Sequence, residues 1–264
     1  MSRPELTGHA SHFYNEKEAR KYHSSSRMIN VQREITLRAI ELLLLPPDET
    51  SLVLDVGCGS GLSGQVLEEK GHVWVGCDVS RDMLQVAHER MEETYSTNNG
   101  GGEENAAMND SDDDDEKEPP STGDLMHHDM GTGLPFRPAT FDACISISAL
   151  QWLCYSNSAK QVPKRRLIRF FSSLYSVLKK SARAVLQFYP ETAEQAVLIS
   201  ECATAVGFGG GKSTMKRFIC KLLDFWIMIR LKYCIAPVSH ESLFFNLYFF
   251  PRLSDLLFDF LTSI

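Results

Sequence analysis

Short apolar runs alternate along the chain with longer stretches in which apolar residues recur every three or four positions. The runs are rich in β-forming residues and are typical of buried parallel strands, which we predict at residues 52–56, 73–77, 125–126, 141–147 and 182–189. The longer stretches predict helices at residues 31–45, 62–70, 80–93, 164–178 and 192–206. This alternation predicts an α/β fold with a doubly wound, mostly parallel sheet covered by helices on both faces.

One segment interrupts the pattern with negative charge. Residues 94–123 hold nine acidic residues and one lysine, whereas the rest of the chain has 26 basic and 25 acidic residues. The formal net charge of −7 therefore belongs to this segment and says little about partners of the folded part. We expect a disordered, solvated acidic insertion, because such a composition buries too little apolar area to offset the entropy of ordering. The alternative is a self-inhibitory mimic of nucleic acid.

The cysteines and the termini limit the classes of protein. Seven cysteines are scattered without a Cys-x-x-Cys pair or a Cys/His cluster at zinc spacing, so we expect reduced thiols and no metal site. The first residues show no secretory signal, and no run approaches the roughly 18 apolar residues of a membrane span. We therefore expect no membrane partner.

The candidate chemistry lies where the first predicted strand meets a glycine-rich turn, Gly57-Cys58-Gly59-Ser60-Gly61. This spacing differs from the Gly-x-Gly-x-x-Gly that suits a pyrophosphate, and Asp55 would repel such a ligand but attract a cationic amino acid end. Asp78, at the end of the next strand, is placed to accept both hydroxyls of a ribose. Adenosine with a cationic amino acid tail describes S-adenosylmethionine. A plain tight turn and a nicotinamide-dependent oxidoreductase are the disfavoured alternatives.

The first 30 residues form a polar arm that carries the aromatic residues Phe13, Tyr14 and Tyr22 among several cations. Aromatic faces can stack on bases while cations meet phosphates. Equally, the aromatic residues can dock on the domain that follows. We predict three parts: the arm at residues 1–30, which covers substrate or cofactor, a cofactor-binding domain at 31–211, and a divergent tail at 212–264.

Several blocks of residues carry a resemblance to a known family. The chain resembles the class I S-adenosylmethionine-dependent methyltransferases, and within them the Williams–Beuren-region, or bud-site-selection, enzymes that modify guanine N7 in small-subunit ribosomal RNA. The likeness covers roughly residues 1–93 and 124–211, and its blocks lie at residues 13–22, 26–29, 54–61, 129–138, 141–154 and 183–191. The resemblance implies a Rossmann-like fold.

The resemblance also implies roles for individual residues. The cofactor would be bound by Asp55, Gly57, Cys58, Gly59, Gly61, Asp78, Val79, Met83, Asp129, Met130 and Ile147. The target base would be oriented by Tyr22, Gln151 and Trp152. No acid or base is expected, because guanine N7 carries a free lone pair and the sulfonium methyl group is already activated.

The implied partners are small-subunit rRNA within the pre-ribosome and a small zinc-binding methyltransferase activator, which would pair edge to edge with the sheet and cover an exposed strand. The implied location is the nucleus and the cytoplasm, in ribosome biogenesis. A non-catalytic ribosome-assembly factor that keeps the fold is the alternative function.

The tail departs from the family. The likeness stops at residues 207–211, and residues 212–264 hold eight of the fifteen phenylalanines. The codons for Gly211-Lys212-Ser213 can read as a splice donor, so we hypothesise that the tail is a translated intron. In that case the strand at 182–189 would lie at the edge of the sheet, and the last strands of the family fold would be missing. The alternative is a genuine divergent tail that supplies substitute strands.

Overall fold

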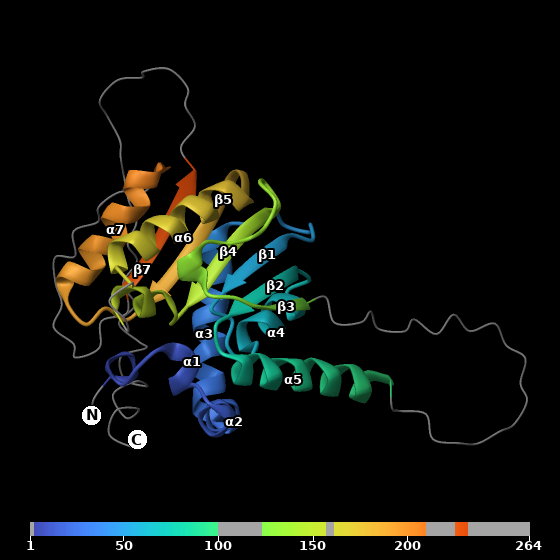
Figure 1. Ribbon diagram of the computed structural model, residues 1–264. Coiled ribbons are helices and arrows are strands. Elements are labelled where there is room, and N and C mark those ends of the chain that lie inside the picture. The colour runs from blue at the N-terminus through green and yellow to red at the C-terminus, as the bar shows by residue number, and fades with distance from the viewer. Residues whose placement is uncertain (1–2, 100–122, 157–160, 210–224, 232–264) are drawn as a thin grey trace, which may run out of the picture.

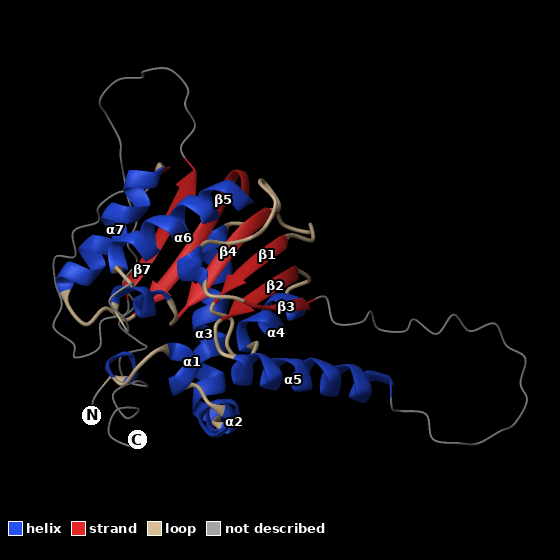
Figure 2. Cartoon of the chain, viewed as in Figure 1, coloured by secondary structure: helices blue, strands red, loops and turns tan. Residues whose placement is uncertain are grey.

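A seven-stranded sheet in the order β3-β2-β1-β4-β5-β7-β6 forms the centre of the molecule (Figures 1 and 2). The computed structural model describes residues 3–99, 123–156, 161–209 and 225–231. The strands are β1 (Leu52–Val56), β2 (Val73–Asp78), β3 (Gly123–His127), β4 (Phe141–Ile147), β5 (Leu178–Phe188), β6 (Phe208–Gly209) and β7 (Phe225–Leu231). The first five are parallel, and the strand order reverses between β1 and β4, where doubly wound folds bind ligands.

Helices cover both faces of this sheet. They are α3 (Ser26–Leu43), α4 (Leu62–Glu69), α5 (Arg81–Asn99), α6 (Pro163–Val177) and α7 (Ala193–Val206), with the shorter η2 (Met130–Thr132) and η3 (Leu150–Cys154) in the loops. Alternate side chains of β1 enter two separate hydrophobic cores. Leu54 and Val56 pack in the core that contains α6 and α7, whereas Val53 packs in the core that contains α3. The apolar run of β1 is thus buried on both faces, as the sequence predicted.

The arm contains η1 (Pro4–Leu6), α1 (Ala10–Phe13) and α2 (Glu16–Ser24), and lies across the end of the sheet where the parallel strands finish (Figure 1). Three contacts attach it to the domain. Ser80 donates its hydroxyl hydrogen to the carbonyl of Tyr14 at 2.7 Å, Arg20 meets both carboxylate oxygens of Glu89, and Arg3 donates to the carbonyl of Pro190 at 3.2 Å. Phe13 and Tyr14 also meet the ring of Trp152, at centroid distances of 6.2 and 6.0 Å, as the alternative of aromatic residues docking on the domain describes.

Two predicted boundaries of the acidic insertion are wrong. Helix α5 begins after Ser80, whose hydroxyl accepts from the amide of Met83 at 3.2 Å, but it continues to Asn99 instead of ending near residue 93. Gly123 belongs to β3, where it pairs with Trp74. Residues 94–99 and Gly123 are therefore ordered parts of regular elements, and the rest of the predicted insertion lies outside the described residues.

The tail contributes a strand to the sheet. β7 pairs antiparallel with β5 over six residues, from Arg183 opposite Arg230 to Phe188 opposite Phe225, and β6 pairs with its other side. β5 is therefore an interior strand, and the edge expected from the intron hypothesis is not found. This arrangement matches the alternative, substitute strands supplied by the tail. The stretch 243–250 lies outside the described residues, and the origin of the tail stays a prediction.

In the described part of the chain, none of the helices has the length and apolar character needed to cross a membrane.

Candidate active site

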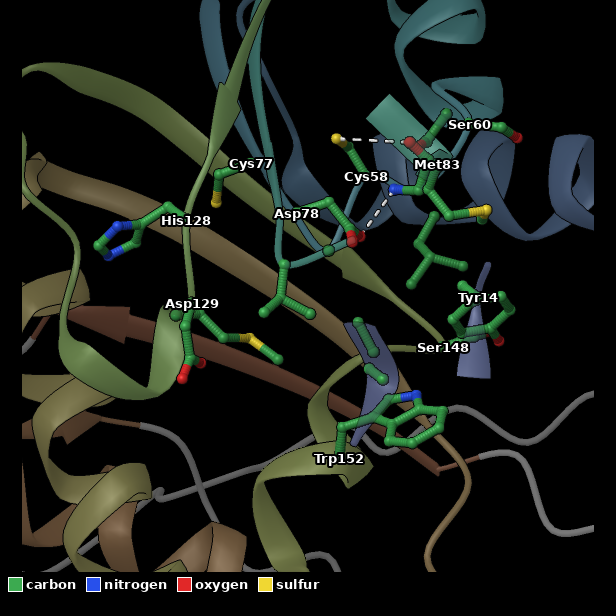
Figure 3. A pocket seen from close by; sticks show the side chains of 18 of the residues that line it. Tyr14, Cys58, Ser60, Cys77, Asp78, Met83, His128, Asp129, Ser148 and Trp152 are labelled. Carbon is green, nitrogen blue, oxygen red and sulfur yellow. Dashed lines mark hydrogen bonds between the residues drawn. The ribbon is translucent and has the colours of Figure 1, made fainter. Parts of the chain in front are cut away.

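A pocket opens at the carboxyl ends of β1, β2 and β4, between the sheet and the arm (Figure 3). The space inside it, with the open solvent at its mouth included, is about 930 Å³. Residues predicted to bind cofactor or base make up much of its wall: Tyr22, Gly57, Cys58, Gly59, Asp78, Val79, Met83, Asp129, Met130, Ile147 and Trp152. The structure thus brings together at one place residues from across the predicted domain and the arm.

The glycine turn forms part of the pocket wall through Gly57, Cys58, Gly59 and Ser60. Gly57 and Gly59 have φ angles of +76° and +54°, a region that favours glycine. A Cβ at Gly57 would stand 2.2 Å from the Cβ of Ala149, and one at Gly59 would stand 2.9 Å from the methyl carbon of Met83. The amides of Gly57 and Cys58 both donate to the carbonyl of Cys77, at 2.7 and 3.2 Å. The conformation of the turn is therefore fixed by packing and by hydrogen bonds to the end of β2.

Asp78 lies at the end of β2 and lines the pocket. One carboxylate oxygen accepts from the amide of Gly59 at 3.0 Å (Figure 3). The other accepts from the amide of Ser80 at 2.8 Å. Burial raises the pKa of Asp78, and the backbone hydrogen bonds act in the opposite direction. Each oxygen keeps a further lone pair for a ligand hydroxyl.

Asp55 lies away from the pocket surface, in the interior of the sheet. It is 0% exposed; one of its oxygens accepts from the hydroxyl of Ser63, and the other has no hydrogen-bond partner. Burial raises the pKa of Asp55 to about 7, against the effect of the Ser63 hydrogen bond, and the charge of Asp78 adds to the increase. Ser63 itself lines the pocket, so the side chain of Ser63 stands between the carboxylate of Asp55 and the pocket.

Two further predicted site residues have other roles in the structure. Gly61 begins α4 with a φ of +73°, and a Cβ there would be 3.3 Å from that of Ala87 in α5, so it allows two helices to pack closely. Gln151 is 3% exposed and is bound at both ends of its amide, donating to the carbonyl of Ser148 at 2.8 Å and accepting from the amide of Tyr189 at 3.5 Å. The amide of Gln151 thus fixes the turn after β4, and its role in orienting the base stays a prediction.

An ion pair that the sequence analysis missed holds the wall on the η2 side. Arg166 of α6 is 8% exposed, lines the pocket and donates to the two carboxylate oxygens of Asp129 at 2.8 and 3.0 Å. Asp129 also accepts from the amide of Gly131 at 2.9 Å. Arg166 precedes the buried Phe170 and Leu174 by four and eight positions, so helical spacing alone places it on the inner face.

Aromatic side chains close the pocket on the side of the arm. Tyr14 stands edge-on to Tyr22 and to Trp152, with ring centroids 6.2 and 6.0 Å apart, and all three line the pocket (Figure 3). Burial raises the pKa of both tyrosines, so their phenols stay protonated at neutral pH. The arm therefore supplies ring surfaces at the pocket mouth, and any base that stacks there meets rings held by the domain.

Other lining residues were not predicted, some of them sequence neighbours of predicted ones and others brought to the pocket by tertiary packing. They are His9, Ala10, Gln32, Ser60, Leu62, Ser63, Cys77, His128, Ser148, Ala149 and Leu153. Among the residues that the structure describes, no three His, Cys, Asp or Glu side chains gather as a metal site would require.

Comparison with known proteins decides the family. A methyltransferase domain model matches residues 54–186, which includes the glycine turn and the ends of β1, β2 and β4. The chain belongs to this methyltransferase family. It is 50% identical over 209 residues to the mouse 18S rRNA (guanine-N(7))-methyltransferase, and the aligned residues cover 79% of this chain and 64% of the mouse protein. It is 44% identical over 211 residues to the fission yeast 18S rRNA (guanine-N(7))-methyltransferase bud23, covering 80% of this chain and 68% of the relative.

Within the methyltransferases, the chain therefore belongs to the 18S rRNA (guanine-N(7))-methyltransferase family, and it spans about two thirds of the length of these relatives. Among solved structures it is similar to magnesium protoporphyrin IX methyltransferase from Synechocystis, with a TM-score of 0.55, 14% identity and coverage of 88% of this chain and 99% of that one. The PH0226 protein of Pyrococcus horikoshii gives a TM-score of 0.54 at 17% identity, over 81% of this chain and 99% of that one. These structures confirm the Rossmann-like fold class.

Proposed function

We propose that the chain is an S-adenosylmethionine-dependent methyltransferase that modifies guanine N7 of small-subunit rRNA in ribosome biogenesis. The observation that carries the proposal is the pocket itself, which is lined by the glycine turn, by Asp78 and by the aromatic side chains of Tyr14, Tyr22 and Trp152. The names of the relatives supply the nature of the nucleic acid and the position methylated.

The residues present fit this cofactor. Gly57 and Gly59 both line the pocket, and a Cβ at either position would clash with Ala149 or Met83, so glycine lets the backbone of the turn border the site where the amino acid end would bind. Asp78 is placed for the ribose hydroxyls, and the apolar side chains of Val79 and Met130 suit the two sides of an adenine ring. When bound, the cofactor supplies a methyl group activated by the positive charge on sulfur.

The chain's own residues contribute binding, orientation and exclusion of water. Guanine N7 needs no base to remove a proton, so the protonated phenols of Tyr14 and Tyr22 are suited to packing against a base rather than to acid–base chemistry. Holding the nucleophile in line with the methyl group is worth several kcal/mol as proximity catalysis, about 7–11 in the best cases. We assign Trp152 and Tyr22 to stacking on the target base, which must be unstacked from RNA to reach the pocket.

Two associated proposals concern partners and location. A small zinc-binding activator would pair with an open edge of the sheet; β3 has a strand neighbour on one side only among the described strands. We also propose that the protein is found in the nucleus and the cytoplasm, as a role in ribosome biogenesis would require, and fluorescence microscopy of the tagged full chain would check this.

The test is titration of the full chain, alone and co-purified with the activator, with S-adenosylmethionine by calorimetry, followed by incubation of the same samples with small-subunit rRNA and labelled cofactor. The proposal predicts saturable binding and label transfer, both lost in Asp78→Ala. A non-catalytic assembly factor would bind RNA without transferring label. No binding by folded protein in either form would contradict the proposal.

A further inference from the structure

The solvent face of α6 carries positive charge that no acidic side chain among the described residues neutralises. Lys164, Arg165 and Arg169 are exposed, and within the described part of the chain none of the three forms an ion pair. Helix α6 itself, Pro163–Val177, contains no acidic residue. Because the chain outside the acidic insertion is nearly neutral, this face is a local concentration of positive charge rather than part of a generally basic surface.

This basic face borders the pocket. Arg166 lies between the exposed cations in sequence, lines the pocket and is bound to Asp129. The side chain of Arg169 approaches Gly133, in the loop directly after η2, with its Cγ 3.4 Å from the position of a Cβ there. Since residues three and four apart are neighbours on a helix surface, Arg165 and Arg169 form one row along the rim next to Arg166.

The wall formed by the arm has a different electrostatic character. Arg20 pairs with Glu16 at 3.3 Å and with Glu89 at 3.1 Å, and Lys21 pairs with Glu18 at 3.7 Å. The cations of α2 are thus partly neutralised where they stand. A polyanion that approaches the mouth meets uncompensated positive charge on the α6 side.

We propose that Arg165 and Arg169, with Lys164, bind the phosphate backbone of the RNA strand that delivers the target guanine, an inference that rests on the proposed function. A base that enters the pocket leaves its sugar and flanking phosphates at the rim. Guanidinium groups match phosphate oxygens in charge and in fork geometry, and they remain charged at every working pH. Arg165 and Arg169 therefore set the direction in which the RNA strand crosses the mouth of the pocket.

The test compares two variants that each remove two positive charges. Arg165→Gln/Arg169→Gln alters the rim, and Arg33→Gln/Lys70→Gln alters α3 and the end of α4, which pack on the opposite face of the sheet. Fluorescence anisotropy with a labelled small-subunit rRNA fragment measures RNA affinity at several salt concentrations, and calorimetry measures cofactor affinity. The rim variant should bind RNA about ten-fold more weakly, with a salt slope reduced by about 1.4 for two single-strand phosphate contacts.

Cofactor affinity should be unchanged in both variants, and the control should bind RNA as the wild type does. Equal RNA affinity and salt slope in the rim variant and the wild type would overturn the inference, as would an equal loss in the control. Anisotropy measures RNA binding without methyl transfer. Wild-type protein that binds RNA but transfers no methyl group would contradict the proposed function, and the RNA affinities of the two variants would still decide the role of Arg165 and Arg169.

Discussion

The buried carboxylate of Asp55 should make the stability of the free protein fall as pH rises. It is 0% exposed, and its pKa is raised to about 7, chiefly by burial. In the unfolded chain an aspartate has a pKa of about 3.9. Between these values the native protein holds a proton that the unfolded chain has lost, so the stabilisation that protonation gives is complete at low pH and is lost as pH rises through about 7.

The magnitude follows from the width of that window. Each pH unit inside it changes the free energy of unfolding by about 1.4 kcal/mol, so the loss from pH 5 to pH 8 is about 3 kcal/mol. Asp55→Asn removes the titration while its amide oxygen can still accept from the hydroxyl of Ser63. The variant should therefore gain about 3 kcal/mol relative to the wild type over the same interval.

Urea unfolding of both proteins at pH 5, 6, 7 and 8 measures this difference, and subtraction removes the titrations that the two proteins share. Ser63→Ala is the companion variant: the hydrogen bond from Ser63 lowers the pKa of Asp55, so its removal should move the window to higher pH. A difference in unfolding free energy that stays constant from pH 5 to pH 8, or changes with the opposite sign, would refute this account of Asp55.

Three further predictions concern the walls of the pocket. Gly57→Ala places a Cβ 2.2 Å from that of Ala149 at a positive φ, so it should cost more than about 2 kcal/mol in urea unfolding, part of which Ala149→Gly restores. Asp78→Ala should abolish cofactor binding in calorimetry while the far-ultraviolet circular dichroism stays that of the wild type. Arg166→Met leaves Asp129 without its cation and should cost about 3 kcal/mol in urea unfolding; the double variant with Asp129→Asn should recover part, and strict additivity would show that the pair does not interact.

The central fold could be predicted because its signals are local. β1 and β4 lie at the predicted residues, since an apolar run rich in β-formers is buried on both faces wherever helices flank a parallel sheet. β7 was missed, although Phe225–Leu231 is apolar and β-forming, because its place depends on pairing with β5 and not on its own pattern. For the same reason the start of β5 was placed at Ala182, whereas the strand begins at Leu178.

The candidate site was predictable where chemistry lies next to the end of a strand. Gly57, Gly59 and Asp78 follow β1 or end β2, so the sheet alone brings them together. Gln151 shows the limit: sequence places it beside Trp152, but only tertiary contacts show that its amide is occupied by backbone groups. Tyr14 needed the docking of the arm, which no local pattern specifies.

The most direct test of the central claim is nucleoside mass spectrometry of small-subunit rRNA after incubation with the full chain, the activator and S-adenosylmethionine. The account predicts one new 7-methylguanosine per RNA, absent when Asp78→Ala replaces the wild type. A methyl group in a different nucleoside, or none in any nucleoside while calorimetry shows the cofactor bound, would contradict it.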